Sequence, residues 1–209
     1  EFGNENAKIL VMGNPANTNA LIGRNAANNS SQTWMAMTML DSNRAKSMLA
    51  KKLSCNVSEI KKMIIWGNHS PTMFPDFENA LKDNQSVASL IEDTNWIDSH
   101  FIPNVQQRGK AVIDARGASS ATSAAKAALD TVIACENITS SDDCFSAAVY
   151  SDGAYGVPEG IMCGFPLMTT PSGEIEIIRD LTLSDSSRSR LNLSIDELLS
   201  EREAVKDLL

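Results

Sequence analysis

Residues Met63–Ser70 have the sequence Met-Ile-Ile-Trp-Gly-Asn-His-Ser, an apolar run followed by a glycine and a polar tail. Four apolar residues before a turn residue are typical of a short buried strand, which would end at Gly67. His69, one of only two histidines in 209 residues, would then lie on the loop just past the strand. Loops at strand ends carry the reacting groups of many α/β enzymes. The alternative interpretation is a hydrogen-bonded structural histidine.

A second polar stretch, Leu40–Lys46, has the sequence Leu-Asp-Ser-Asn-Arg-Ala-Lys. Asp41 and Arg44 are three residues apart, close to one helical turn, so both side chains can project to the same side. Together with His69 they supply an acid, a guanidinium and an imidazole. These groups can hold a carboxylate and move a proton on and off a hydroxyl. The alternatives are a plain helix cap for Asp41 and a solvated helix arginine for Arg44.

Hydrophobic patterns predict mixed helices and strands around these two stretches. Upstream, we expect a strand over 7–12, a turn at Gly13-Asn14-Pro15, a helix starting near Asn17, and a short apolar element over 35–40. A helix over 43–52, capped by Asp41 or Ser42, and a small helix over 58–62 follow. For Asn14, the alternative to a binding role is that Gly13-Asn14-Pro15 is an ordinary turn.

Downstream, 73–90 is expected to hold a hairpin around the polar turn 82–85, and 98–113 a helix that Pro103 bends or delays. We expect a helix over 119–134 and strands over 145–150, 161–169 and 174–178. Ser194 and Glu197 have the spacing of a capping box, which predicts a last helix ending near Leu209.

Composition excludes several classes of protein. The formal net charge is −8 and no basic cluster occurs, so we expect neither nucleic-acid nor anionic-membrane binding. No apolar run approaches the ~20 residues of a membrane span. The four cysteines are widely spaced, which predicts no metal site and suits a reducing, cytoplasmic compartment.

Several further motifs occur in a fixed order with the two stretches above: Gly-Asn-Pro-Ala-Asn-Thr-Asn at 13–19, Gln-Arg-Gly at 107–109, Ser-Ser-Ala at 119–121 and Tyr-Gly-Val-Pro at 155–158. In this order and spacing they closely resemble malate dehydrogenases of the cytosolic type, within the lactate/malate dehydrogenase superfamily. The resemblance covers nearly the whole chain, from about Lys8 to Leu209.

The resemblance implies an α/β fold in which the end of a Rossmann-type nucleotide domain, residues 1–30, precedes an α+β substrate domain, residues 31–209. That second domain would contain antiparallel strands and a long C-terminal helix. The glycine-rich turn that opens the nucleotide domain in the family does not occur here. We therefore expect the chain to be the C-terminal portion of a longer enzyme.

The resemblance also implies roles for particular residues. His69 would accept the hydroxyl proton, and Asp41 would pair with its other ring nitrogen. Arg44 would hold the substrate carboxylate, with Asn14 and Ser120 nearby; a helix cap is the alternative for Ser120. Met12, Gly13, Asn14 and His69 would border the cofactor.

The implied reaction is oxidation of malate to oxaloacetate with NAD, and NADP stays open because the acidic residue that separates them precedes this chain in the family. A homodimer of the complete enzyme is implied, acting on a small dicarboxylate. The family's substrate-closing loop also precedes Lys8, so we expect this chain alone to be poorly active. The alternatives are a lactate or other 2-hydroxy acid dehydrogenase, or a non-catalytic fragment that acts as an interaction module.

Overall fold

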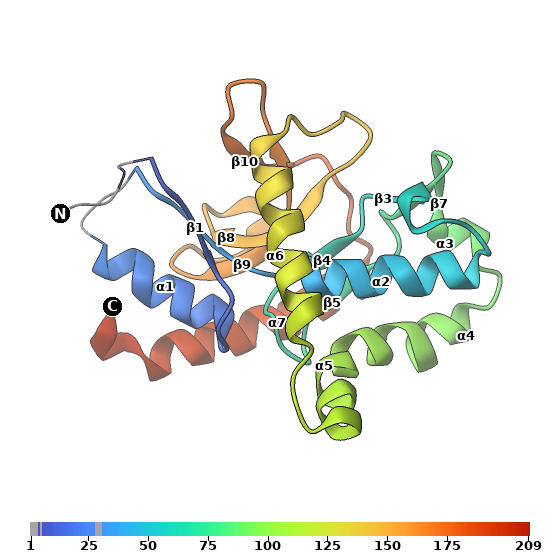
Figure 1. Cartoon of the computed structure of the whole chain (residues 1–209), viewed down its shortest axis with the longest axis horizontal. Coiled ribbons are helices and arrows are strands. Elements are labelled where there is room, and N and C mark those ends of the chain that lie inside the picture. Colours follow the sequence, from blue (N-terminus) through green and yellow to red (C-terminus); the bar gives the residue numbers. More distant parts are fainter. Residues whose placement is uncertain (1–3, 5, 28–30) are drawn as a thin grey trace.

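A five-stranded sheet in the order β1-β2-β8-β9-β10 organises the chain (Figure 1). The computed structural model describes residue 4, residues 6–27 and residues 31–209. The strands are β1 Lys8–Val11, β2 Thr33–Ala36, β3 Ile60–Lys61, β4 Ile64–Trp66, β5 Phe74–Asp76, β6 Leu81–Lys82, β7 Gln85–Ser86, β8 Phe145–Tyr150, β9 Met162–Thr169 and β10 Ile175–Ile177. The α-helices are α1 Ala16–Ala26, α2 Met39–Lys52, α3 Val87–Leu90, α4 Thr94–Trp96, α5 Ile102–Arg116, α6 Ala121–Glu136 and α7 Asp185–Ala204. Shorter turns are the 3-10 helices Val57–Glu59, Ala154–Gly156 and Lys206–Leu208, and the π-helical turn Ile97–Phe101.

The sheet combines parallel and antiparallel pairing. β1 runs parallel to β2, whereas β8, β9 and β10 are antiparallel neighbours. One pair, Ala36 with Ala148, joins β2 to β8 in antiparallel register. The predicted mixture of α/β and antiparallel strands is confirmed. The sheet contains strands from both sides of the expected domain boundary at residue 30, which stays a prediction; residues 28–30 lie outside the described residues.

Helices cover both faces of the sheet. Adjacent residues of a strand point to opposite faces, and Met35 packs in the cluster that contains Cys135 of α6, whereas Ala36 packs against Ala16 and Ala20 of α1. α6 and α1 therefore lie on opposite faces of β2. On the α1 side, α7 runs next to α1 (Figure 1), and the Thr18 hydroxyl donates to Glu201 between them.

The small sheet β4-β5 carries the loop with His69. β4 is fully buried and pairs antiparallel with β5. The chain leaves β4 at Gly67, which forms an isolated antiparallel bridge with Gly164 of β9. This bridge fixes the end of β4 against the large sheet. The strand predicted over 63–66 is thus confirmed, and so is its end at Gly67.

Two helix starts differ from the prediction. α2 begins at Met39 with Thr38 as its N-cap, so Asp41 and Ser42 lie within the helix rather than capping it. α7 begins at Asp185, and the Ser184 hydroxyl accepts from the Ser187 backbone N–H. Ser194 is therefore an interior residue of α7, and the predicted capping box is wrong.

The other elements follow the prediction in outline. The segment predicted as a helix over 58–62 is a 3-10 turn followed by β3, because its last residues pair with β6. The hairpin predicted around 82–85 is present as β6 and β7. Pro103 lies in the first turn of α5, directly after the π-helical turn.

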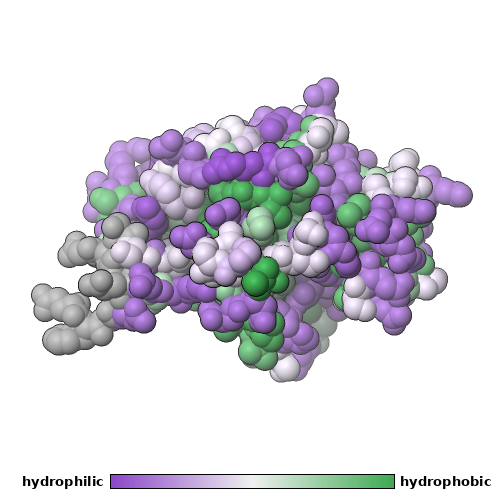
Figure 2. All heavy atoms as spheres, turned by 90° about the horizontal axis from the view of Figure 1, so that it is seen from above, coloured by the Kyte–Doolittle hydropathy of each residue, from purple (hydrophilic) through white to green (hydrophobic). Residues whose placement is uncertain are grey.

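The surface is mainly hydrophilic on the face shown in Figure 2, with a hydrophobic area near its middle. In the part of the chain that the structure describes, no helix is long and apolar enough to cross a membrane. The fold thus presents its polar residues outward and buries β4, β8 and most of β9.

Candidate active site

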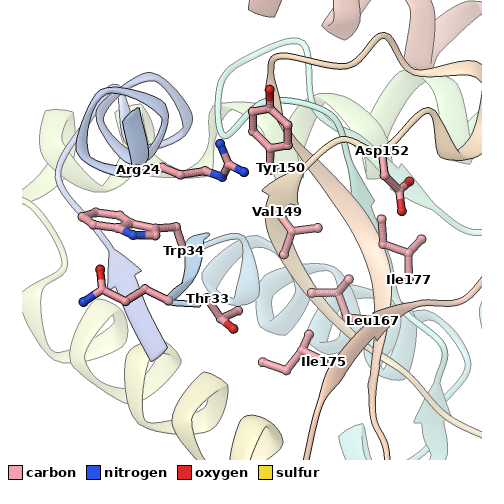
Figure 3. Close-up of a pocket in the computed structure, with 10 residues that line it drawn as sticks. Arg24, Thr33, Trp34, Val149, Tyr150, Asp152, Leu167, Ile175 and Ile177 are labelled. Carbon is pink, nitrogen blue, oxygen red and sulfur yellow. The ribbon is translucent and has the colours of Figure 1, made fainter. Parts of the chain in front are cut away.

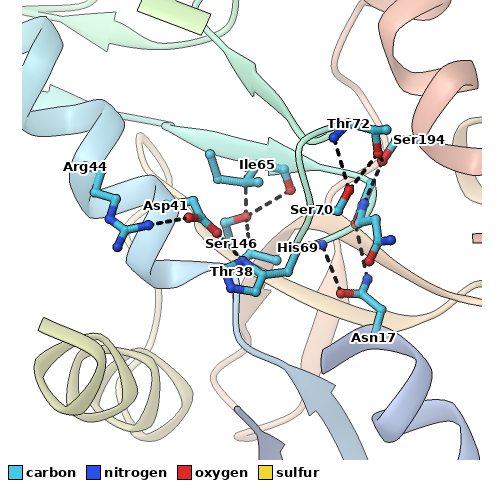
Figure 4. A network of polar contacts seen from close by, with 12 residues as sticks. Asn17, Thr38, Asp41, Arg44, Ile65, His69, Ser70, Thr72, Ser146 and Ser194 are labelled. Atoms are coloured by element: carbon cyan, nitrogen blue, oxygen red, sulfur yellow. Dashed lines mark hydrogen bonds and ion pairs between the residues drawn. The ribbon is translucent and has the colours of Figure 1, made fainter. Parts of the chain in front are cut away.

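Asp41 forms the centre of a buried polar cluster at the start of α2 (Figure 4). Its carboxylate is completely buried and contacts two side chains. Oδ2 is hydrogen-bonded to Nδ1 of His69, and Oδ1 accepts from an Arg44 guanidinium nitrogen at 3.2 Å. Since a carboxylate only accepts, the proton of this His69 tautomer lies on Nδ1. The three residues that the sequence singled out are therefore brought together.

The ring of His69 is largely buried, with 13% of its side chain exposed. Burial and the Arg44 charge lower the pKa of His69, but the hydrogen bond that the ring donates to Asp41 and the negative charge of Asp41 raise it by more. The net effect is a His69 pKa above its ordinary value of 6.5. The Asp41 contact thus favours the protonated form of the ring, and an imidazole can both accept and return a proton.

Arg44 keeps most of its donors available as far as the described residues are concerned. Its side chain is 17% exposed, which excludes the alternative of a solvated surface arginine. The contact with Asp41 uses one N–H group, whereas a guanidinium has five. A Cβ atom built on Gly109 of α5 would lie 3.9 Å from the Arg44 nitrogen, so the guanidinium lies beside α5. It can still present a planar pair of donors to a carboxylate.

Asn17 of α1 holds the backbone of His69. Its side chain is buried, and its Oδ1 accepts from the His69 backbone N–H at 3.1 Å. Its Nδ2 donates to the carbonyls of Met162 at 2.8 Å and Gly67 at 3.3 Å. Sequence reasoning missed this role, because Asn17 shares the first turn of α1 with the polar residues Thr18 and Asn19 and nothing local distinguishes it from them.

The hydroxyl of Ser146 on β8 holds β4 in place just before the loop. It accepts from the Ile65 backbone N–H at 3.0 Å and donates to the Ile65 carbonyl at 3.2 Å. It also bonds to the Thr38 hydroxyl at 2.9 Å. Thr38 precedes Asp41 by less than one turn, so a single hydroxyl connects the elements that carry His69 and Asp41 (Figure 4).

Met12, Gly13 and Asn14 follow the end of β1 and are exposed. Because β1 is parallel to β2, these residues and Thr38 lie at the same edge of the sheet. The Gly13 carbonyl accepts from the Asn19 side chain at 2.9 Å. Among the described residues no hydrogen bond joins Asn14 to Asp41, Arg44 or His69, so its predicted part in the site stays a prediction.

Ser120 lies at the N-cap position of α6, as its alternative interpretation requires. Its hydroxyl donates to the Ser123 hydroxyl at 2.7 Å and makes no capping bond to the backbone. No described hydrogen bond connects it to the Asp41 cluster. Its predicted contact with substrate therefore also stays a prediction.

A pocket of about 220 Å³ lies elsewhere, between β2 and β8 (Figure 3). It is on the Thr33 side of Ala36, the residue that pairs with Ala148. Its lining residues are Arg24, Gln32, Thr33, Trp34, Val149, Tyr150, Asp152, Leu167, Ile175 and Ile177. The Arg24 guanidinium stacks over the Tyr150 ring at 3.7 Å. None of the predicted site residues lines this pocket, so it is separate from the Asp41 cluster.

No group of three or more His, Cys, Asp or Glu side chains that could hold a metal ion occurs in residues 4, 6–27 and 31–209. The four cysteines are free thiols. Burial raises the pKa of Cys163 to about 12 and that of Cys135 to about 11. These thiols are therefore protonated, small buried side chains at neutral pH.

Known proteins share both sequence and fold with this chain. Residues 38–209 match the family model of the lactate/malate dehydrogenase, alpha/beta C-terminal domain. The malate dehydrogenase of Naegleria fowleri is 40% identical with a TM-score of 0.90, over 99% of this chain and 63% of that one. The lactate dehydrogenase of Trichomonas vaginalis, solved with NADH and oxamate, is 29% identical with a TM-score of 0.89, over 96% and 62%.

A more distant structure shares the fold alone. The malate dehydrogenase of Plasmodium falciparum is 19% identical with a TM-score of 0.82. This chain spans slightly less than two thirds of the length of these solved relatives. The family model covers most of the chain, including Asp41, Arg44 and His69. The chain therefore belongs to the lactate/malate dehydrogenase family of oxidoreductases.

Proposed function

We propose that this chain is the substrate-binding part of an NAD-dependent malate dehydrogenase, which interconverts malate and oxaloacetate. The carrying observation is the His69 ring placed against the buried Asp41 carboxylate, with the Arg44 guanidinium on the other oxygen of Asp41. Oxidising a 2-hydroxy acid requires a base for the hydroxyl proton and a cation for the neighbouring carboxylate. The cluster supplies both.

His69 is the proposed proton acceptor. With its Nδ1 proton committed to Asp41, the neutral ring offers the Nε2 lone pair to the malate hydroxyl. Asp41 then stabilises the imidazolium that forms, which also raises the pKa of His69. In the reverse direction the imidazolium returns the same proton to the carbonyl oxygen of oxaloacetate.

Arg44 is the proposed clamp for the carboxylate next to the reacting carbon. Its guanidinium is planar and presents paired donors that match the two oxygens of a carboxylate. The ion pair with Asp41 fixes the guanidinium on the His69 side of α2. Substrate held there would have its hydroxyl near the His69 ring.

The nicotinamide cofactor is proposed to meet the chain at Met12, Gly13, Asn14 and His69. The first three are exposed at the end of β1, where open α/β sheets bind nucleotides. The exposed Asn14 amide can donate to and accept from polar groups of a ring carboxamide or ribose. The bound cofactor supplies the hydride acceptor; NAD is proposed, and NADP is the alternative. Ser120, at the start of α6, is proposed as a further substrate contact.

Malate is favoured over lactate by the relatives. Identity to the Naegleria fowleri malate dehydrogenase is 40%, against 29% to the Trichomonas vaginalis lactate dehydrogenase. Both structures match this chain almost equally well in fold, with TM-scores of 0.90 and 0.89. Lactate is therefore the second candidate substrate.

The test is NADH-linked turnover by the complete gene product, with malate and lactate assayed in parallel and NAD compared with NADP. We expect malate and NAD to give the higher kcat/KM. Arg44→Lys should lower kcat/KM by roughly 10- to 100-fold, because a paired charged hydrogen bond contributes about 1.5–3 kcal/mol. Higher kcat/KM with lactate would replace malate as the substrate, and full activity of Arg44→Lys would exclude the clamp.

The 209-residue chain itself is expected to be poorly active or inactive in the same assay. Positioning of the two reactants can supply about 7–11 kcal/mol of a barrier. Here the proposed cofactor contacts are limited to His69 and the three exposed residues after β1. Malate oxidation by this chain at the rate of the complete gene product would contradict this expectation.

A cytoplasmic homodimer is proposed for the complete enzyme. The four cysteines are free thiols, three of them buried, which suits a reducing compartment. On α6, Leu129, Val132 and Ile133 are 59%, 52% and 50% exposed, an apolar stripe that a second subunit would cover. Light scattering of the complete gene product should give twice the monomer mass, and a monomer mass would exclude the dimer.

A further inference from the structure

Asn68, the residue before His69, is held by α7 at both its backbone and its side chain. Its backbone N–H donates to the Ser194 hydroxyl at 2.7 Å. Its side-chain amide donates to Glu197 at 2.8 Å and to Glu201 at 2.8 Å. Asn68 is 2% exposed, so these bonds are shielded from water. The residue that leads into His69 therefore cannot move without breaking contacts to α7.

Glu197 gathers three donors on one oxygen. Oε2 accepts from the Asn68 amide at 2.8 Å, from the Thr72 hydroxyl at 2.6 Å and from the Ser70 hydroxyl. All three donors are neutral, and no ion pair of Glu197 occurs in the part of the chain that the structure describes. Hydrogen bonds to a charged acceptor are about twice as strong as neutral ones. A single carboxylate thus ties down the residues on both sides of His69.

The position of this carboxylate is fixed by the core. Ser194, Glu197 and Glu201 follow one another at intervals of three and four residues, so they lie on one face of α7. Leu191, Ile195 and Leu198 of the same helix are buried in the main hydrophobic cluster. Packing of α7 therefore decides where the loop after β4 is held.

We propose that Glu197 is a positioning residue for His69. It sets the loop over residues 68–72 so that the His69 ring lies against Asp41, and it does so through Asn68, Ser70 and Thr72 rather than by touching the ring. The effect of Glu197 on turnover rests on the proposed function, because His69 transfers a proton only in that proposed reaction. Its effect on the ring can be measured without any reaction.

The experiment uses nitrogen-15 NMR of the imidazoles in the 209-residue chain, which contains only His69 and His100. Asp41→Asn supplies the reference spectrum of a His69 ring without its carboxylate. In Glu197→Ala we expect the His69 signals to move toward that reference. Glu197→Gln, which keeps an acceptor oxygen of the same reach, should restore much of the wild-type spectrum.

Two controls separate positioning from a general loss of structure. Glu203→Ala changes an exposed acid of the same helix that pairs only with the exposed Lys206 in the described contacts, and it should leave His69 unchanged. The His100 ring packs against the Trp96 ring in a tilted arrangement and should keep its signals in every folded variant. If the signals of both histidines change in Glu197→Ala, that variant is unfolded. The Thr72→Val variant then tests the proposal.

Thr72→Val removes one of the three donors and leaves Glu197 in place. It should shift the His69 signals part of the way toward the Asp41→Asn reference. A wild-type His69 spectrum in folded Glu197→Ala, or in Thr72→Val where Glu197→Ala does not fold, would overturn the proposal.

Turnover supplies a second readout. In the complete gene product, Glu197→Ala should lower kcat by on the order of 100-fold, the effect of a small misplacement of a reacting group. Absence of malate and lactate turnover in the wild-type protein would refute the proposed function but leave the NMR result standing. Unchanged kcat in Glu197→Ala beside an active wild type would instead refute the positioning role.

Discussion

The loop around His69 and the turn after β1 are both proposed to serve the same reaction, but they differ greatly in how the rest of the fold holds them. The His69 loop is bonded to α1, α2 and α7, with Asn17, Asp41 and Ser194 each contributing a buried polar atom. The turn at Met12, Gly13 and Asn14 is exposed. Its described side-chain hydrogen bond is from Asn19 to Gly13.

This difference indicates which groups of the proposed reaction are preorganised within this chain. The groups for proton transfer and carboxylate binding are preorganised by buried contacts, which is what such groups need in order to act. The edge proposed for the cofactor lacks comparable support within the described residues. The predictions below test whether changes in the first region have large effects and changes in the second have small ones.

The largest effect is expected from His69→Gln in the complete gene product. Loss of a general base lowers kcat by roughly 10²- to 10⁴-fold, measured by NADH absorbance. The matched control is His100→Gln, which changes the exposed histidine and should retain full activity. A His69→Gln variant with more than a tenth of the wild-type kcat would show that the buried cluster does not carry the reaction.

Gly67→Ala should strongly destabilise the chain. Its φ is +86°, and a Cβ atom there would lie 2.1 Å from the Ser194 hydroxyl. A left-handed conformation costs an L-residue about 1–2 kcal/mol, and overpacking adds about 1–3 kcal/mol. Gly173→Ala, with the same φ and open space around it, should show only the first cost. Urea unfolding measures the free energy of unfolding of both variants. An equal decrease in the two would mean that α7 leaves room for a side chain at Gly67.

Two asparagines provide the third test. Asn17→Ala removes a buried side chain and leaves the His69 backbone N–H and the Met162 carbonyl without their partner, at a cost of about 1–3 kcal/mol each. Asn14→Ala changes an exposed residue and should alter the free energy of unfolding by less than about 0.5 kcal/mol. A larger loss for Asn14→Ala would reverse the comparison between the two regions.

The smallest effect concerns pH. The pKa of His69 is raised in the folded protein, so protonated His69 stabilises the fold. This contribution is complete below the unfolded pKa of about 6.5 and disappears as pH rises through the higher folded value. The difference in unfolding free energy between the wild type and His69→Gln should therefore shrink on raising the pH. A difference that grows with pH would show that the Asp41 contact does not favour the imidazolium.

Local sequence patterns predicted the secondary structure correctly where polar residues mark the ends of an apolar run. The strand over 145–150 was predicted with the bounds that β8 has, because its apolar run is bounded by polar residues. The start of α7 was missed for the opposite reason. Its first turns are polar and rich in serine and arginine, and the buried residues begin with Ser187 and Leu191. The apolar stripe therefore indicated only the second half of the helix.

The candidate site divides in the same way. The proximity of Asp41, Arg44 and His69 could be predicted, because the family resemblance joined three residue types that suit one chemistry. Asn17, Ser146 and Glu197 could not, since their roles arise from contacts with residues 52, 81 and 129 positions away. Ser194 and Glu197 were even assigned to a local motif, a capping box, whereas both face the His69 loop.

The bridge between Gly67 and Gly164 has a consequence for how variation at this site should be interpreted. A Cβ atom on Gly164 would lie 2.4 Å from the Ile65 carbonyl oxygen, so two backbones cross here with no room for a side chain. A saturation library selected only for folding should already be strongly depleted of replacements at both glycines. Intolerance there would report the crossing of two backbone segments, although Gly67 lies only two residues before His69. Only tolerance at Asp41, Arg44 and His69, measured separately for folding and for turnover, would separate architecture from chemistry.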